Sequence, residues 1–445
     1  MKIWLNYRHF SITFLFLIVS ISTSAAEQFG RFSVGAFSST EKFNSTADGA
    51  PENDAQNFLG RMYLRVADIE SGHSEFVADL RDNYDMFGTL NMTQQQLDSK
   101  NAFQARTIYV GNFPAKNKWN YEVGRFSLME TGGTFTDGLV VQHHFTEASR
   151  LGIFGGANPY SEADQLVEYV PHAIDMGIYF SYEPNEPRAV KNFFMNFALV
   201  QNQYSSEVDR QYFYENIYYQ WGPKSRILTT GYLDFVPTTK LQTGTFNYDQ
   251  RVNDRQTSHL HLLAVDTITY RRLQNIRSTL PASPYEQGQL YWDFLWGRDN
   301  MIQPMVTYGH REVDGLTKNE NRLNVIFNDF EDHRLDANFY IGQRSNFVSQ
   351  DLFAGLGGGF YSAKWEFSGD LQLAQENYSA QVLHPITATA NVSYVQNRDL
   401  FYVASLEYAQ DENVVIWANF LKLTYRFGSK ETAPLRDGAP TKGAL

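Results

Sequence analysis

The stretch LKLTYRF at residues 421–427 alternates strictly between two kinds of side chain. One set is apolar or aromatic and consists of Leu421, Leu423, Tyr425 and Phe427. The residues between them, Lys422, Thr424 and Arg426, are polar or charged. Side chains of a β-strand point alternately to its two faces, so this stretch predicts a strand with one apolar and one polar face.

The same period of two residues continues through most of the chain from residue 27 onward. Clear examples lie at residues 175–182, 289–296, 335–342 and 364–373. Short polar connections largely alternate with longer ones, such as 39–56, 83–102, 156–173 and 374–387. This order is typical of antiparallel strands joined by turns at one rim and by loops at the other. This alternation of short and long connections holds along the whole chain only if residues 241–249 form a further strand, which brings the strand count to 22.

The composition of the 445 residues excludes several classes of protein. A formal net charge of −12 is unfavourable for binding nucleic-acid phosphates, so we expect no nucleic-acid partner. The absence of cysteine excludes disulfides, a thiol nucleophile and cysteine-ligated metals. A mean hydropathy of −0.40 with a single short apolar run excludes a bundle of membrane-spanning helices.

The N-terminal residues predict export from the cytoplasm. Lys2 and Arg8 precede an apolar run at 10–20, and small residues follow up to Ala26. This order is typical of a cleaved signal peptide, and the run is too short for a membrane anchor, which takes about 20 residues. We therefore expect a signal peptide at 1–26, one barrel domain at 27–427 and a disordered C-terminal tail at 428–445, which is small, charged and without periodicity.

The apolar faces of the predicted strands meet either a second sheet, as in a soluble sandwich, or lipid. Aromatic residues favour lipid, because they gather at strand ends as in the girdles at the two interfaces of a bilayer. They include Trp119, Tyr121, Trp292, Trp296 and Trp417. We therefore predict an all-β fold, a single large antiparallel transmembrane β-barrel with an even strand number between 16 and 22.

The closing strand at 421–427 resembles the C-terminal assembly signal of Gram-negative outer-membrane β-barrels of the porin type, whose last strand ends in an aromatic residue. Phe427 takes that position here, although residues 428–445 follow it. Arg125 in the sequence VGRF, with Asp137 after it, resembles the Gly-Arg strand ends of substrate-type porins. The resemblance implies an outer-membrane location, surrounding lipid and lipopolysaccharide, and recognition by the barrel-assembly machinery. It also implies a pore for small hydrophilic solutes, with a homo-oligomer allowed.

If the apolar faces meet lipid, the polar faces line the interior. By alternation, the candidates for lining the lumen are Arg61, Arg65, Glu75, Asp79, Arg81, Arg106, Glu122, Asp293, Asp336, Arg344, Lys364, Glu366 and Asp370. Further inward candidates are Asp175, Glu215, Asp234, Arg322, Glu407, Lys422 and Arg426. Acids and bases are nearly balanced, which predicts passive diffusion through a charge-balanced lumen. The alternative is that these charges pair across strands and only hold the wall.

Two connections, 83–102 and 126–136, are the candidates for a constriction inside the barrel. A group of glycines in one predicted strand, Gly355, Gly357, Gly358 and Gly359, is interpreted as room for a loop or bulge that approaches the wall closely.

We expect no enzyme, because no G-x-S-x-G, H-E-x-x-H or paired-carboxylate motif stands out. His143 and His144 point to opposite faces of their strand. His259 and His261 share a face, but the sequence identifies no third ligand, so neither a metal nor a cofactor is predicted. Three alternatives stay open: a secretion or assembly partner acting through the 428–445 tail, an outer-membrane enzyme built from loops, and a soluble secreted β-protein.

Overall fold

The computed structural model describes residues 27–43, 52–69, 74–85, 101–112, 118–159, 172–184, 193–266, 268, 271, 285–297, 299–330 and 334–428. The predicted signal peptide and all of the predicted tail beyond Gly428 lie outside these residues. Within them, no helix has the length and apolar character needed to cross a membrane.

Strands account for nearly all of the described residues. They are β1 (Glu27–Phe43), β2 (Glu52–Asp68), β3 (Ser74–Asp85), β4 (Asn101–Asn112), β5 (Trp119–Leu128), β6 (Thr134–His144), β7 (Ser149–Ala157), β8 (Ala173–Tyr182), β9 (Phe193–Tyr204), β10 (Glu207–Trp221), β11 (Ser225–Val236), β12 (Lys240–Asn253), β13 (Gln256–Val265), β14 (Tyr285–Trp296), β15 (Asn300–Arg311), β16 (Thr317–Phe330), β17 (Leu335–Asn346), β18 (Ser349–Tyr361), β19 (Trp365–Tyr378), β20 (Val382–Leu383), β21 (Ile386–Val395), β22 (Leu400–Gln410) and β23 (Val414–Gly428). One turn of 3-10 helix, η1 (Met129–Thr131), connects β5 and β6.

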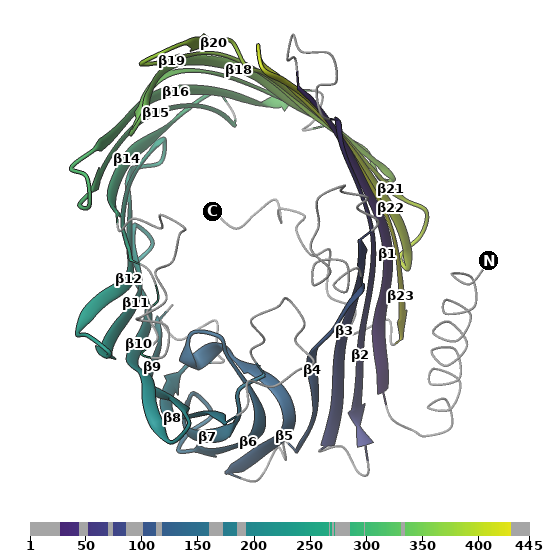
Figure 1. Ribbon diagram of the computed structural model, residues 1–445, viewed down its shortest axis with the longest axis vertical. Helices are drawn as coiled ribbons and strands as arrows, with labels where there is room; N and C mark the ends of the chain where they lie inside the picture. The colour runs from purple at the N-terminus through teal and green to yellow at the C-terminus, as the bar shows by residue number, and fades with distance from the viewer. Residues whose placement is uncertain are drawn as a thin grey trace.

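The strands form one antiparallel sheet that closes into a barrel, because β1 pairs with both β2 and β23 (Figure 1). The two-residue β20 pairs with β19 in the same register as β21 and begins that strand, so the wall has 22 strands within the described residues. The predicted all-β fold, the single barrel and the even strand number are confirmed. The predicted strand at 241–249 lies within β12. A two-sheet sandwich is wrong for this chain, because one sheet closes on itself.

Both ends of the barrel lie at one rim, where Phe29 of β1 pairs with Gly428 of β23. We call this the terminal rim and the opposite one the loop rim. The longest connections all join strands at the loop rim, and they are 86–100, 158–172 and 266–284. Very short turns at 205–206 and 347–348 lie at the loop rim as well, so the predicted alternation holds for the long loops but not for every turn.

The seam between β1 and β23 is packed on both faces. On the inside, Ser33 Oγ and Thr424 Oγ1 lie 3.1 Å apart. On the outside, the ring of Phe427 covers Gly30, where a Cβ would come within 2.2 Å of the ring. The predicted closing strand is therefore the second half of β23, and its aromatic residue covers the seam.

The two faces of the wall differ in chemistry. The carbonyl oxygens of Thr131 and Gly132 accept hydrogen bonds from Tyr212 and Tyr232, at 3.4 and 3.0 Å. Thr131 ends η1 and Gly132 follows it. Since η1 is the short blue turn drawn inside the ring in Figure 1, the two tyrosines mark the inner face. Following the register around the wall, exposed apolar side chains such as Phe339 lie on the outer face.

Aromatic side chains form a girdle near the terminal rim. Rings with centroids 5.7 to 6.0 Å from the next follow one another across β8 to β12, and they are Tyr182, Phe193, Tyr219, Trp221 and Tyr248. A second group on β19, β21 and β22 consists of Trp365, Tyr394 and Tyr402. Such a girdle matches the interface between the hydrocarbon of a bilayer and its headgroups.

Several strands are longer than the sequence pattern predicts. β1, β2, β19 and β21 extend into 39–56 and 374–387, which the sequence analysis assigns to connections. β1 and β2 each have 17 residues, whereas crossing a bilayer takes about 9–11. Towards the rims both faces are polar, so the alternation ends while backbone pairing continues the strand.

The glycines of β18 make room for side chains of the wall and not for a loop. A Cβ at Gly355 would lie 2.0 Å from the ring of Tyr340, and one at Gly357 would lie 2.4 Å from Oδ1 of Asn338. Both neighbours belong to β17, which pairs with β18. The interpretation that a loop fills this space is therefore wrong, because large inward side chains of the adjacent strand already occupy it.

The packing of the seam predicts that Phe427→Ala destabilises the barrel more than Leu421→Ala. Leu421 lies on the same strand and face but is 59% exposed. Because the Phe427 ring is only partly enclosed, we expect a loss on the order of 1–2 kcal/mol, below the about 3–5 kcal/mol typical of a core Phe→Ala change. Urea unfolding of the protein in lipid vesicles measures both variants, and equal midpoints would contradict this account of the seam.

Candidate solute pathway and constriction

The hairpin of β5 and β6 leaves the wall before it reaches the loop rim. Pairing between β4 and β5 ends at Ile108 and Arg125, although β4 continues along β3. Pairing between β6 and β7 ends at Asp137 and Ala157. Beyond these points, β5 and β6 pair only with each other. We call residues 126–136 the hairpin tip, which is one of the two segments that the sequence analysis names as a constriction.

A row of three glycines lies where the hairpin bends away. Gly124, Gly138 and Gly156 are directly opposite one another on β5, β6 and β7. Gly124 has a φ of +130°, which other residues rarely adopt. A Cβ at Gly138 would lie 2.1 Å from the carbonyl oxygen of Gly155. Because no side chain stands between these backbones, the three strands can curve sharply towards the inside.

An apolar core holds the hairpin tip against the inner face of the wall. Phe126 and Leu128 of the tip are buried. They belong to one cluster with inward side chains of the wall, namely Val140, Phe154, Tyr179, Ala198, Val200, Tyr212 and Tyr214. The turn η1 packs against β8, β9 and β10. The tip is therefore a fixed part of the inner surface.

Two ion pairs tie the hairpin in place. Arg125 and Asp137 form two parallel hydrogen bonds of 2.6 Å, with side chains only 10% and 15% exposed. Arg125 Nη1 also donates to the carbonyl oxygen of Ala105 on β4 at 2.9 Å, beyond the last strand pair between β4 and β5. Arg150 pairs with Glu130 of η1 at 2.6 Å. The loss of one partner from a buried pair of this kind costs about 3–5 kcal/mol.

A polar cavity of about 380 Å³ opens beside the hairpin tip. It is lined by Asp175, Asn202 and Arg210, among others. The Asp175 carboxylate accepts hydrogen bonds from Asn158 and Asn202, and Arg210 donates to Asp234 at 2.8 Å. Hydrogen-bonding groups that are fixed in this way offer a solute polar contacts without first having to reorganise.

Several of the predicted lumen residues pair with opposite charges on neighbouring strands. Arg61 contacts Asp79 at 2.8 Å, and Arg65 contacts Glu75 at 2.6 Å. Glu75 also accepts a hydrogen bond from Tyr109 at 2.9 Å. The remaining pair joins Arg344 to Asp351 at 2.8 Å. For these residues the geometry matches the alternative in which charges hold the wall.

Four predicted carboxylates accept hydrogen bonds from uncharged side chains. The pairs are Gln142 with Glu122 (3.4 Å), Gln303 with Asp293 (2.8 Å), Tyr361 with Asp336 (2.8 Å) and Tyr340 with Asp370 (3.1 Å). All four stay on the inner face. Asp293 also lies 3.0 Å from Nε2 of His259, whereas Glu122, Asp336 and Asp370 have no ion pair within the described part of the chain.

Other predicted residues differ in their surroundings. Arg81 and Arg106 have no ion pair within the described residues, and Arg106 instead lies 5.8 Å from the ring centroid of Phe135 in the hairpin tip. Lys364 lies in the exposed turn before β19, not in the wall, because the strand starts one residue later. Glu366 lies on β19, on the same face as Asp370.

The assignment of Glu215 to the lumen is wrong. The buried Tyr212 and Tyr214 take the inner face of β10, so Glu215 shares the outer face with Phe213 and Tyr219. The alternation of side chains could not identify the inner face of this strand, because aromatic residues stand on both of its faces.

The other predicted constriction is the connection 83–102. The structure describes only its two ends, 83–85 and 101–102, and residues 86–100 lie outside the described part.

The sequence analysis missed residues whose role depends on strand register. Glu130 lies in a connection, where alternation assigns no face, and its partner Arg150 lies on the inner face of β7. Asp249 of β12 stands directly opposite His259 of β13. This register brings a third polar side chain to the histidine pair, which no pattern within a single strand reveals.

No protein-family model and no curated protein sequence matches the chain. Among solved structures, it is similar to OpdQ of Pseudomonas aeruginosa, with 9% sequence identity, 90% of this chain and 98% of that chain covered, and a TM-score of 0.44. It is also similar to the translocation pore of the P pilus usher PapC, with 7% identity, 91% and 100% coverage, and a TM-score of 0.50. The similarity to the usher pore concerns the fold alone, and it agrees with the single large β-barrel that the sequence predicts.

The glycine row predicts that Gly138→Ala destabilises the barrel while Gly155→Ala does not. The added Cβ would meet backbone at Gly138, whereas at Gly155 its nearest neighbour is 3.7 Å away. Overpacking of this kind costs about 1–3 kcal/mol. Denaturant unfolding in lipid vesicles tests both variants, and a Gly138→Ala protein as stable as Gly155→Ala would contradict the role of the row.

Proposed function

We propose that this protein is a pore in the outer membrane of a Gram-negative bacterium and lets small hydrophilic solutes diffuse through its lumen. The observation that carries the proposal is the closed barrel with an apolar outer face, a charged inner face and a hairpin tip packed inside it. Apolar side chains would pack a dry interior better than polar ones, so a polar interior indicates a water-filled lumen.

Physical chemistry favours a membrane as the surroundings of the barrel. Exposed apolar side chains cover the outer face, and aromatic rings form the girdle near the terminal rim. A closed barrel also pairs the two edge strands of the sheet with each other, so its backbone needs no water there, as a bilayer requires. Lipid and lipopolysaccharide are then the outer partners, and β23 is the strand that the assembly machinery would recognise.

The inner surface supports diffusion with weak selectivity for ion charge. Arginines are largely matched by carboxylates on neighbouring strands, as in the pairs Arg61–Asp79 and Arg344–Asp351. Arg81 is an exception, because it has no ion pair within the described residues, and it lines a cavity of about 310 Å³ together with Asp82 and Gln104. A single arginine of this kind can contact an anionic group of a solute without closing the pore to cations.

The hairpin tip would set the narrowest part of the pathway. It carries the exposed Met129 on the inside of the barrel and borders the polar cavity at Asp175. A solute that passes the tip would exchange its water for the hydrogen-bonding groups of that cavity. No step of this passage requires a chemical reaction, so the proposal is a channel and not an enzyme.

Single-channel recording in a planar bilayer tests this proposal. The mature protein should give stable conductance steps with a small reversal potential under a salt gradient. Replacing residues 129–133 by Asn-Gly should raise the conductance of each step, because it removes the part of the tip inside the lumen. Replacing the exposed connection 312–316 at the same rim by Asn-Gly is the matched control and should leave the conductance unchanged.

A folded protein that conducts no ions would contradict the pore. Equal conductance of the wild type and the 129–133 variant would contradict the hairpin tip as constriction while leaving the pore in place. Folding of each sample is checked independently by heat-modifiable migration in gel electrophoresis, so a failure to fold is not read as a closed channel.

A further inference from the structure

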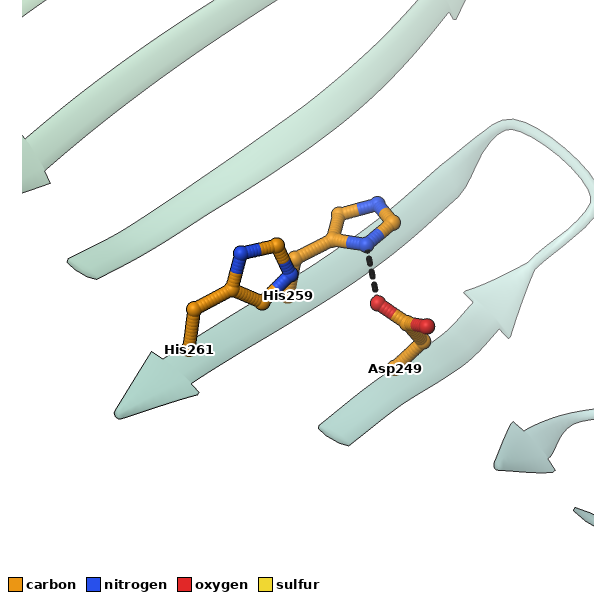
Figure 2. Close-up of side chains that lie close together, drawn as sticks. All are labelled: Asp249, His259 and His261. Atoms are coloured by element: carbon orange, nitrogen blue, oxygen red, sulfur yellow. Dashed lines mark hydrogen bonds and ion pairs between the residues drawn. The ribbon is translucent and has the colours of Figure 1, made fainter. Parts of the chain in front are cut away.

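Three polar side chains of β12 and β13 meet on the inner face near the terminal rim (Figure 2). Asp249 stands opposite His259, and His261 follows two residues later on the same face. One ligand atom from each residue lies within 4.8 Å of the others. We propose that Asp249, His259 and His261 bind a divalent transition-metal ion, with Zn²⁺ as the preferred ion, and that the site opens to the lumen.

The hydrogen bonds of His259 are those of a metal-binding histidine with a proton in place of the metal. Its Nδ1 lies 2.5 Å from Oδ1 of Asp249, and its Nε2 lies 3.0 Å from Oδ2 of Asp293. Because both partners are carboxylate oxygens, both ring nitrogens carry a proton in this arrangement. A metal between Nδ1 and Asp249 would replace one of these protons and release it to solvent.

Asp293 would then act as the supporting carboxylate of the site. Histidines that bind metals usually donate their other ring N–H to a carboxylate or carbonyl, which fixes the ring and raises its basicity. Here Nε2 of His259 already has that partner, and Gln303 holds the other oxygen of Asp293 at 2.8 Å. Tyr291 stacks on His259 with ring centroids 4.2 Å apart and an interplanar angle of 6°. The ring is therefore oriented before any ion arrives.

The remaining ligands are also in suitable places. Oδ2 of Asp249 accepts a hydrogen bond from Arg226 at 2.5 Å, which orients the carboxylate and leaves Oδ1 on the side of His259. His261 meets the edge of Tyr291, and one of its ring nitrogens lies within 4.8 Å of the ligand atoms of Asp249 and His259. Once His259 has released its Nδ1 proton, two carboxylates face one guanidinium, so the local charge then favours a cation.

The ligand set selects the class of ion. Two imidazole nitrogens and one carboxylate oxygen suit Zn²⁺, whereas Mg²⁺ and Ca²⁺ prefer sites built from oxygen. Three protein ligands leave the fourth tetrahedral position for water or an anionic solute. This inference concerns the wall itself and does not depend on the proposed transport function.

Calorimetric titration of the mature, tag-free protein with ZnCl₂ in detergent tests the site. We expect one Zn²⁺ per chain, release of a proton that depends on the ionisation heat of the buffer, and no comparable binding of Mg²⁺. His261→Ala and Asp249→Asn should abolish this binding. Asp293→Asn should keep the stoichiometry and weaken the affinity by about 10–100-fold, as expected for a supporting carboxylate.

His144→Ala is the matched control, since this histidine lies on β6 and bonds only to Asn120 among the described side chains. It should bind Zn²⁺ like the wild type. Absence of Zn²⁺ binding by the wild type, or equal binding by wild type and His261→Ala, would overturn the proposal. Heat-modifiable migration confirms that each variant is folded. The His261 side chain forms no hydrogen bond among the described residues, so loss of binding in a folded His261→Ala variant supports the site.

Discussion

The pairing of β1 with β23 is the interaction on which the rest of the structure depends. An open sheet of this size would leave two edges with unpaired N–H and C=O groups, and each such group is costly where water is absent. Closure satisfies both edges at once and fixes the alternation of faces around the whole wall. Ser33 and Thr424 pack this seam on the inside, and Phe427 covers Gly30 on the outside. The seam therefore keeps the inward side chains of the barrel on its inner face.

The proposed constriction comes from the place where the hairpin of β5 and β6 leaves the wall. The row of Gly124, Gly138 and Gly156 lets the hairpin bend, and the Arg125–Asp137 pair fills the gap that the bend leaves beside β4. The apolar core under the hairpin tip stabilises the bent arrangement. In the proposed pore, the glycines therefore allow the hairpin to bend inward and narrow the lumen.

Much of the fold could be predicted from the sequence, because alternation in single strands such as 364–373 reports directly on the two faces. The ends of the strands were harder to predict, since β1 and β19 continue where both faces are polar. The candidate functional residues could be predicted from the sequence only in part. The position of the hairpin tip followed from its connection, but the Asp249–His259 contact depends on register between strands, and Glu215 was misplaced because β10 carries aromatic residues on both faces.

The central claim is that the hairpin tip lies in a water-filled lumen and narrows it. The chain has no cysteine, so Met129→Cys introduces a single thiol at a side chain that is 74% exposed. Adding a bulky, water-soluble thiol reagent during single-channel recording tests the claim most directly. The account predicts an abrupt and lasting fall in conductance with Met129→Cys and none with Leu139→Cys on the outer face. An unchanged current after complete modification of Met129→Cys would contradict it.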